Sequence, residues 1–170
     1  MQFVVILALF FVTVYGATLN TRQEINAHGL NFTLTGPPDE QYWLLTEENL
    51  PEGISRTEFN EDIPSPRLVR RGIDCSGSHR ANGGDCIALL NAINQDGNQI
   101  QNSPRDIRYN NCFLSWSSVV YGVRFEFTPH AREIFDACSN NGWISGLKRD
   151  VNIGGRTTTV CMSNRPNGCN

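Results

Sequence analysis

Apolar residues recur at helical spacing over Asp85–Ile93, where one face collects aliphatic side chains and a cysteine. Asn82 or Asp85 is available to cap this run at its start, and Asp96-Gly97 is available to end it. The pattern predicts a first helix that points Cys86 at the core.

The same spacing returns in residues 128–138. Thr128-Pro129 combines a residue that favours the N-cap with a proline suited to the first helical turn. Asn140-Asn141-Gly142 ends the run, because asparagine and glycine accept the left-handed backbone that often follows a helix. We expect a second helix here, which also points its cysteine, Cys138, at the core.

Three other stretches have the pattern of strands: Ile107–Phe113, Val119–Phe127 and Thr157–Met162. The middle one alternates most regularly, which predicts one buried apolar face and an opposite face that carries Arg124 and Glu126. Helices interleaved with such strands predict an α+β fold, in which an antiparallel sheet carries two helices on one face.

The chain opens with an unbroken apolar run, Phe3–Val12, which is followed by small residues at Gly16 and Ala17. The run is too short to span a bilayer and is typical of a cleaved secretory signal. We expect a signal peptide at residues 1–16 and a secreted, extracellular product. No stable membrane insertion is expected, since no later stretch is apolar for about 18 residues.

Residues 17–71 differ in composition from the rest of the chain. They hold nine acidic and five basic side chains, for a net charge of −4, and no cysteine. Closely spaced prolines interrupt every periodic run, which predicts an acidic, partly disordered pro-segment. Asn31 begins an Asn-Phe-Thr sequence and is a candidate glycosylation site.

Arg70 and Arg71 stand directly before the part of the chain that holds the cysteines. Two adjacent guanidinium groups, placed after prolines that keep the chain extended, suit the acidic pocket of a kexin-type processing protease. We expect cleavage after Arg71, with residues 72–170 as the mature cysteine-rich domain. The alternative is that the two arginines are solvated side chains of a linker.

All six cysteines follow this pair: Cys75, Cys86, Cys112, Cys138, Cys161 and Cys169. A domain this small buries too little surface to depend on its core alone, and secretion provides an oxidising compartment. Three disulfides are therefore expected, although the sequence does not choose among the possible pairings. A metal site is not expected, because no cysteine pair has zinc-knuckle spacing and no histidine adjoins a cysteine.

Three motifs resemble the secreted killer toxins encoded by viruses of smut fungi and their fungal relatives. They are Gly72–Ser78, the helix that ends in Asn140-Asn141-Gly142, and the close from Arg149 to Cys169. The resemblance covers most of residues 72–170. It implies a killer-toxin-like sandwich and interference with cation channels of a target cell through basic surface residues. Beside His79-Arg80 and after the second helix, the chain lacks cysteines that the family carries.

The chain is also similar to a small necrosis-associated effector domain that leaf-infecting fungi secrete. That domain pairs a helix bearing an Asp-Cys motif, here Asp85-Cys86, with a strand cysteine, here Cys112, and has a glycine-rich close. Both resemblances imply a secreted toxin or virulence effector that acts on a host or competitor cell.

Candidate contacts with the target lie in the glycine-flanked stretch 141–149, which holds Trp143, Lys148 and Arg149. An aromatic ring beside cations on a loop suits contact with a receptor or an ion channel. The alternative for Trp143 is packing over the end of the second helix.

Catalysis is not expected, and no cofactor is implied, because residues 72–170 hold no Ser-His-Asp order, paired-carboxylate motif or phosphate loop. The alternative is a small secreted ribonuclease-like enzyme, in which Arg124, Glu126 and His130 supply a cation and an acid–base pair. Nucleic acid is not an expected partner, since a net charge of +1 over residues 72–170 offers no electrostatic footprint.

Overall fold

A computed structural model of the 170-residue chain describes residues 29–55 and 72–169. The predicted signal peptide and the Arg70-Arg71 pair lie outside the described residues.

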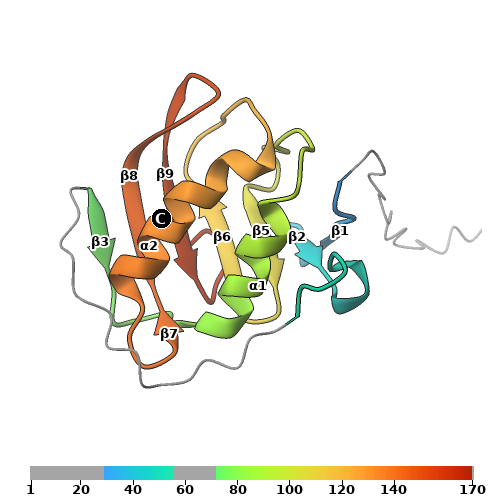
Figure 1. The fold of residues 1–170 in the computed structure, drawn as a ribbon. Helices are drawn as coiled ribbons and strands as arrows, with labels where there is room; N and C mark the ends of the chain where they lie inside the picture. Colours follow the sequence, from blue (N-terminus) through green and yellow to red (C-terminus); the bar gives the residue numbers. More distant parts are fainter. Residues whose placement is uncertain (1–28, 56–71, 170) are drawn as a thin grey trace, which may run out of the picture.

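The described residues form an α+β fold in which one large sheet carries two helices on a single face (Figure 1). The sheet has seven strands in the order β1-β2-β5-β6-β9-β8-β3. Its strands are β1 (Thr33–Thr35), β2 (Tyr42–Leu45), β3 (Ile73–Cys75), β5 (Asp106–Tyr109), β6 (Cys112–Trp116), β8 (Gly146–Ile153) and β9 (Arg156–Ser163). Neighbouring strands are antiparallel except β2 and β5, which are parallel. A separate pair is formed by β4 (Ala81–Asn82) and β7 (Trp143–Ile144).

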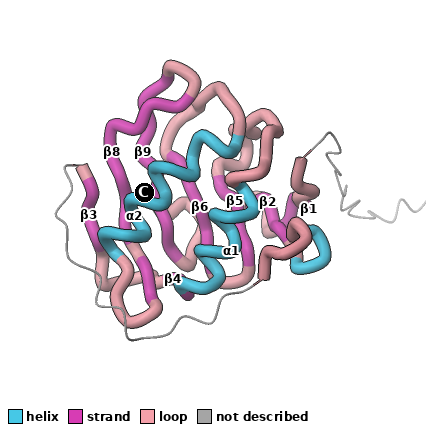
Figure 2. Tube along the Cα trace, in the orientation of Figure 1, coloured by secondary structure: helices cyan, strands magenta, loops and turns pink. Residues whose placement is uncertain are grey.

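Both predicted helices are confirmed, as α1 (Gly83–Ile93) and α2 (Thr128–Cys138). The helices lie next to each other across the sheet (Figure 2), with α1 over β5 and β6 and α2 over β8 and β9. The Asn82 side chain caps α1 by accepting a hydrogen bond from the Asp85 amide at 3.2 Å. Thr128 is not the cap of α2, because that position belongs to Phe127, and the Thr128 side chain is buried in the first turn.

The strand predicted over Ile107–Phe113 is wrong in its extent. Asn110 adopts a left-handed backbone, with φ of 46°, and turns the chain between β5 and β6. Asparagine tolerates this conformation better than most residues, so the apolar run divides into a hairpin instead of one strand.

The strand predicted over Val119–Phe127 is also wrong. Residues 124–127 form a 3-10 helix, η2 (Arg124–Phe127), and the residues before it form a loop. Gly122, with φ of 147°, interrupts the extended path, and Val123 contacts Gln99 through an isolated bridge. The predicted faces are consequently mixed, since Tyr121 is exposed whereas Arg124 is buried.

The three expected disulfides are present, and the described residues contain no free cysteine. Cys86–Cys112 joins α1 to β6, and Cys75–Cys138 joins β3 to the end of α2. Cys161–Cys169 fastens the C-terminal tail to β9. The bridges therefore hold both helices and the tail on the sheet.

Residues 29–55, here called the N-terminal segment, form part of this fold although they precede Arg71. The segment contributes β1, β2 and a 3-10 turn, η1 (Glu47–Asn49), at one edge of the sheet. Four of its apolar side chains are buried in the common core: Leu30, Phe32, Trp43 and Leu45. Cleavage after Arg71 stays a prediction, and its consequences depend on this packing.

No helix in the described ranges is long and apolar enough to cross a bilayer.

Two tryptophans provide a matched test of this packing. Trp43 is 3% exposed and Trp143 is 43% exposed. In the uncut chain, we expect Trp43→Ala to lower the free energy of unfolding by about 3–5 kcal/mol, because it removes a buried aromatic side chain. Trp143→Ala should cost less than about 1 kcal/mol. Chemical denaturation measures both, and equal losses would contradict a core role for the N-terminal segment.

Candidate functional site

Residues 117–127, here called the aromatic loop, display a group of apolar side chains at the surface. Val119 is 47% exposed, Tyr121 is 58% exposed and Phe125 is 46% exposed. These are three of the four exposed large apolar side chains in the part of the chain that the structure describes, and the fourth is Trp143. Three large exposed apolar side chains on one loop make this loop a candidate surface for contact with a partner.

Asn102 fixes the first half of the aromatic loop. Its amide oxygen accepts hydrogen bonds from the Val120 amide at 3.0 Å and from the Trp116 indole N–H at 3.1 Å. Its amide nitrogen donates to the Val120 carbonyl at 2.6 Å. The Gly122 carbonyl accepts another bond from the Ile100 amide at 3.0 Å. The loop therefore has a defined backbone.

Glu126 fixes the second half and joins it to the turn between β8 and β9. One carboxylate oxygen accepts a hydrogen bond from the Val123 amide at 2.9 Å, and the other accepts one from the Gly154 amide at 3.2 Å. The backbones meet so closely that a Cβ on Gly154 would lie 1.2 Å from the Tyr121 carbonyl oxygen. Only glycine fits at this contact. At the start of β9, the Arg156 guanidinium lies over the Tyr121 ring, 5.4 Å from its centroid.

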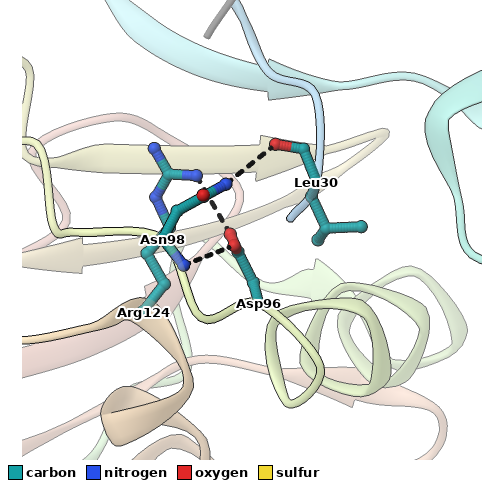
Figure 3. A network of polar contacts seen from close by, with 4 residues as sticks. All are labelled: Leu30, Asp96, Asn98 and Arg124. Carbon is teal, nitrogen blue, oxygen red and sulfur yellow. Dashed lines mark hydrogen bonds and ion pairs between the residues drawn. The ribbon is translucent and has the colours of Figure 1, made fainter. Parts of the chain in front are cut away.

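A buried ion pair joins Arg124 of the aromatic loop to Asp96 (Figure 3). The Arg124 Nη1 atom is 2.9 Å from the Asp96 Oδ2 atom, and both side chains are almost completely buried. The other Asp96 oxygen accepts a hydrogen bond from the Asn98 amide at 3.0 Å. Two backbone hydrogen bonds join the same two stretches. The Arg124 amide donates to the Asn98 carbonyl, and the Phe125 amide donates to the Asp96 carbonyl. The stretch that follows α1 and the start of η2 are thus held together.

The N-terminal segment completes this network from the opposite side. The Asn98 side-chain amide donates to the Leu30 carbonyl at 3.4 Å (Figure 3). The Arg124 guanidinium lies over the Phe32 ring, 4.5 Å from its centroid. An apolar ring therefore covers a charge that the protein has already removed from water.

The predicted acid–base cluster does not assemble as the sequence pattern suggested. Arg124 is buried and paired with Asp96, and Glu126 accepts two backbone hydrogen bonds. His130 contacts Lys148 instead, with 3.1 Å between Nδ1 and Nζ. Arg124, Glu126 and His130 therefore each bind a different partner and do not contact one another as a cluster. Among the described residues, no group of three or more histidine, cysteine or acidic side chains is placed to hold a metal ion.

The predicted target contacts occupy different environments. Trp143 lies in β7 and is half exposed. Arg149 is exposed on β8 and forms an ion pair with Asp74 at 3.0 Å. Lys148 is only 17% exposed at its side chain, because it reaches Glu133 of α2 at 3.0 Å. Trp143 and Arg149 are accessible, whereas Lys148 is engaged within the fold. Asn31, the candidate glycosylation site, is exposed.

The sequence pattern missed the exposed positions of Tyr121 and Phe125. The available signal was Gly122 in the middle of the alternating run, because an isolated glycine in a strand pattern often marks an irregular backbone. Nothing in the sequence pattern indicated that Asn102 and Glu126 would supply the bonds that hold the loop.

A family model described as fungal WD-like matches residues 19–169, on both sides of Arg71. No curated protein matches the chain. No solved structure matches it either.

His130 makes the stability of the fold depend on pH. Burial lowers the pKa of His130, the Lys148 charge lowers it further, and Glu133 partly opposes them. The unfolded chain therefore takes up this proton first as the pH falls, so stability should decrease below about pH 6.5. We expect His130→Gln to reduce that decrease. Melting temperatures between pH 8 and pH 5 measure it, with His79→Asn, at an exposed histidine, as the control. The same pH profile in His130→Gln and the wild type would contradict the assignment.

Proposed function

The chain belongs to the fungal WD-like family, and we propose that it is a secreted fungal toxin or virulence effector that binds another cell through the aromatic loop. The description of the family names no activity, so the proposal depends on the site. The observation that carries it is the exposed group Val119, Tyr121 and Phe125 on a backbone held by Asn102 and Glu126.

The fixed backbone favours binding because a loop that already has its bound shape loses little conformational entropy on association. Aromatic side chains on such a loop supply large contact areas with few rotatable bonds. Arg156 adds a cation beside Tyr121. Together with the resemblance to killer toxins, this combination of rings and a cation leads us to propose a receptor or an ion channel of the target cell as the partner.

Secretion and maturation are parts of the same proposal. Three disulfides require an oxidising compartment, which supports export through the secretory pathway. We place cleavage by a kexin-type protease after Arg71 in this same pathway, during export. The arrangement of two helices over a mostly antiparallel sheet is compatible with the proposed likeness to the killer-toxin sandwich.

The first test removes the apolar side chains from the aromatic loop. Tyr121→Ala combined with Phe125→Ala should abolish the response of target cells, because it removes the rings that would enter the partner. Each substitution should change stability by less than about 1 kcal/mol, since both side chains are exposed. Plant tissue and competitor fungal cells are both exposed to the protein, because a response by one of them selects effector or toxin.

The matched control is Trp143→Ala with Arg149→Glu, which alters the other accessible surface and should leave the response unchanged. Loss of the response in this control, with full response to the loop variant, would move the contact to the Trp143 surface. RNA cleavage by the wild-type protein that disappears in Glu126→Ala would instead favour the ribonuclease-like alternative.

A second test moves the loop without changing its side chains. Gly154→Ala would place a methyl group against the Tyr121 carbonyl, whereas a Cβ on Gly155 would meet no atom within 4 Å. Both glycines have positive φ, so each variant carries a similar backbone strain of about 1 kcal/mol. Gly154→Ala alone should weaken the response of target cells. Equal responses to the two variants at equal folded fractions would show that the position of the loop does not matter.

A further inference from the structure

The N-terminal segment is joined to the rest of the molecule by packing and by the peptide chain, but by no disulfide. All six cysteines follow Arg71, and all are used within the part that begins at Gly72. Residues 72–169 are here called the body. If the chain is cut after Arg71, only noncovalent contacts decide whether the N-terminal segment stays on the body.

The backbone of the N-terminal segment continues the sheet of the body. Strand β2 pairs with β5 in parallel, with Trp43 opposite Ile107 and Leu45 opposite Tyr109. All four side chains are buried. At the right of Figure 1, β2 lies beside β5, with β1 next to it at the end of the sheet. Without the segment, β5 would be an edge strand with unpaired backbone groups.

Polar contacts also hold this strand pair, through Arg108 on the opposite face and through the hydroxyl of Tyr109 on the buried face. The Arg108 guanidinium donates to the Tyr42 hydroxyl at 2.8 Å and lies over the rings of Tyr42 and Phe113. The Tyr109 hydroxyl donates to the Glu47 carboxylate at 3.2 Å. Both faces of the added strands therefore contact the body.

The start of the segment covers the buried ion pair of the body. Phe32 lies over the Arg124 guanidinium, and the Leu30 carbonyl accepts a bond from Asn98. The backbone at Gly29 approaches so closely that a Cβ there would lie 2.3 Å from the Asn98 side chain. Departure of the segment would expose Asp96 and Arg124 to water and remove the ring above them.

We propose that cleavage after Arg71 does not release the N-terminal segment, and that the processed protein is a noncovalent complex of two chains. This inference rests on the processing step of the proposed function. The partner of the body is an extended segment of its own precursor, which adds two strands to the β5 edge and covers the Asp96–Arg124 pair. The segment is a second subunit of the folded product.

The test cuts the folded, oxidised chain by two routes. A kexin-type protease is used on the natural sequence, and a site-specific protease is used on a variant that carries its recognition sequence in place of residues 60–66. Native mass spectrometry and size-exclusion chromatography at micromolar concentration follow each cut. We expect two fragments under denaturing conditions and one complex under native conditions. Recovery of the body alone after the site-specific cut would overturn the proposal.

Matched tryptophan variants identify the contact that retains the segment. After the site-specific cut, Trp43→Ala should weaken retention by about a hundredfold or more, whereas Trp143→Ala should leave it unchanged. If Trp43→Ala does not fold, Trp43→Phe replaces it in the test, and this variant should also weaken retention of the segment. Retention that is indifferent to every Trp43 variant would contradict docking through β2.

The two proteases test separately whether the chain is cut after Arg71 and whether the N-terminal segment stays on the body after a cut. Failure of the kexin-type protease to cut after Arg71, with retention of the segment after the site-specific cut, would remove the processing step and keep the docking. A clean cut by both proteases followed by release of the segment would support the processing step and overturn the docking.

Discussion

The buried ion pair between Asp96 and Arg124 is the interaction on which the arrangement of the other parts depends. Removing two charges from water is costly, and their attraction offsets this cost only when the remaining polar atoms also find partners. Here Asp96 accepts a second bond from Asn98. The buried Nη2 atom of Arg124 has no hydrogen-bond partner among the described residues, and the guanidinium lies beneath the Phe32 ring. Loss of one partner would leave an uncompensated charge in the core. The pair consequently holds three stretches of chain in one arrangement.

These three stretches carry the features on which the proposed function depends. The residue that supplies the guanidinium, Arg124, starts η2 and is part of the aromatic loop. Asp96 follows α1, which Cys86 fastens to β6. Leu30 and Phe32 belong to the N-terminal segment, which provides the cover. The aromatic loop and the N-terminal segment thus meet at the same buried ion pair.

Local signals in the sequence were enough to predict α1, α2 and β9. Helical spacing and capping act within a few residues, so the aliphatic face of α1 could be predicted without knowledge of the fold, and the cap was narrowed to Asn82 or Asp85. The even cysteine count likewise predicted three disulfides, but their pairing depends on which elements meet in space.

Long-range contacts explain what the sequence could not predict. The alternating run from Val119 was expected to be a strand. Asn102 instead binds its backbone from outside the run, Glu126 binds it from within, and Gly122 interrupts it. Arg124 looked like a solvated side chain because nothing near it in sequence indicated Asp96 as its partner. The strands of the N-terminal segment are short, and their burial comes from pairing with β5, which lies far along the chain. Arg124, the run from Val119 and the strands of the N-terminal segment meet their partners only in the assembled fold.

A double-mutant cycle on the ion pair tests the central claim most directly. Unfolding free energies are measured for the wild type, Asp96→Asn, Arg124→Met and the double variant. Each single substitution should cost about 3–5 kcal/mol, because it leaves one charge buried alone. The double variant should cost less than the sum by at least about 1 kcal/mol. Losses that add within about 0.5 kcal/mol would contradict the claim that this pair holds the three stretches together.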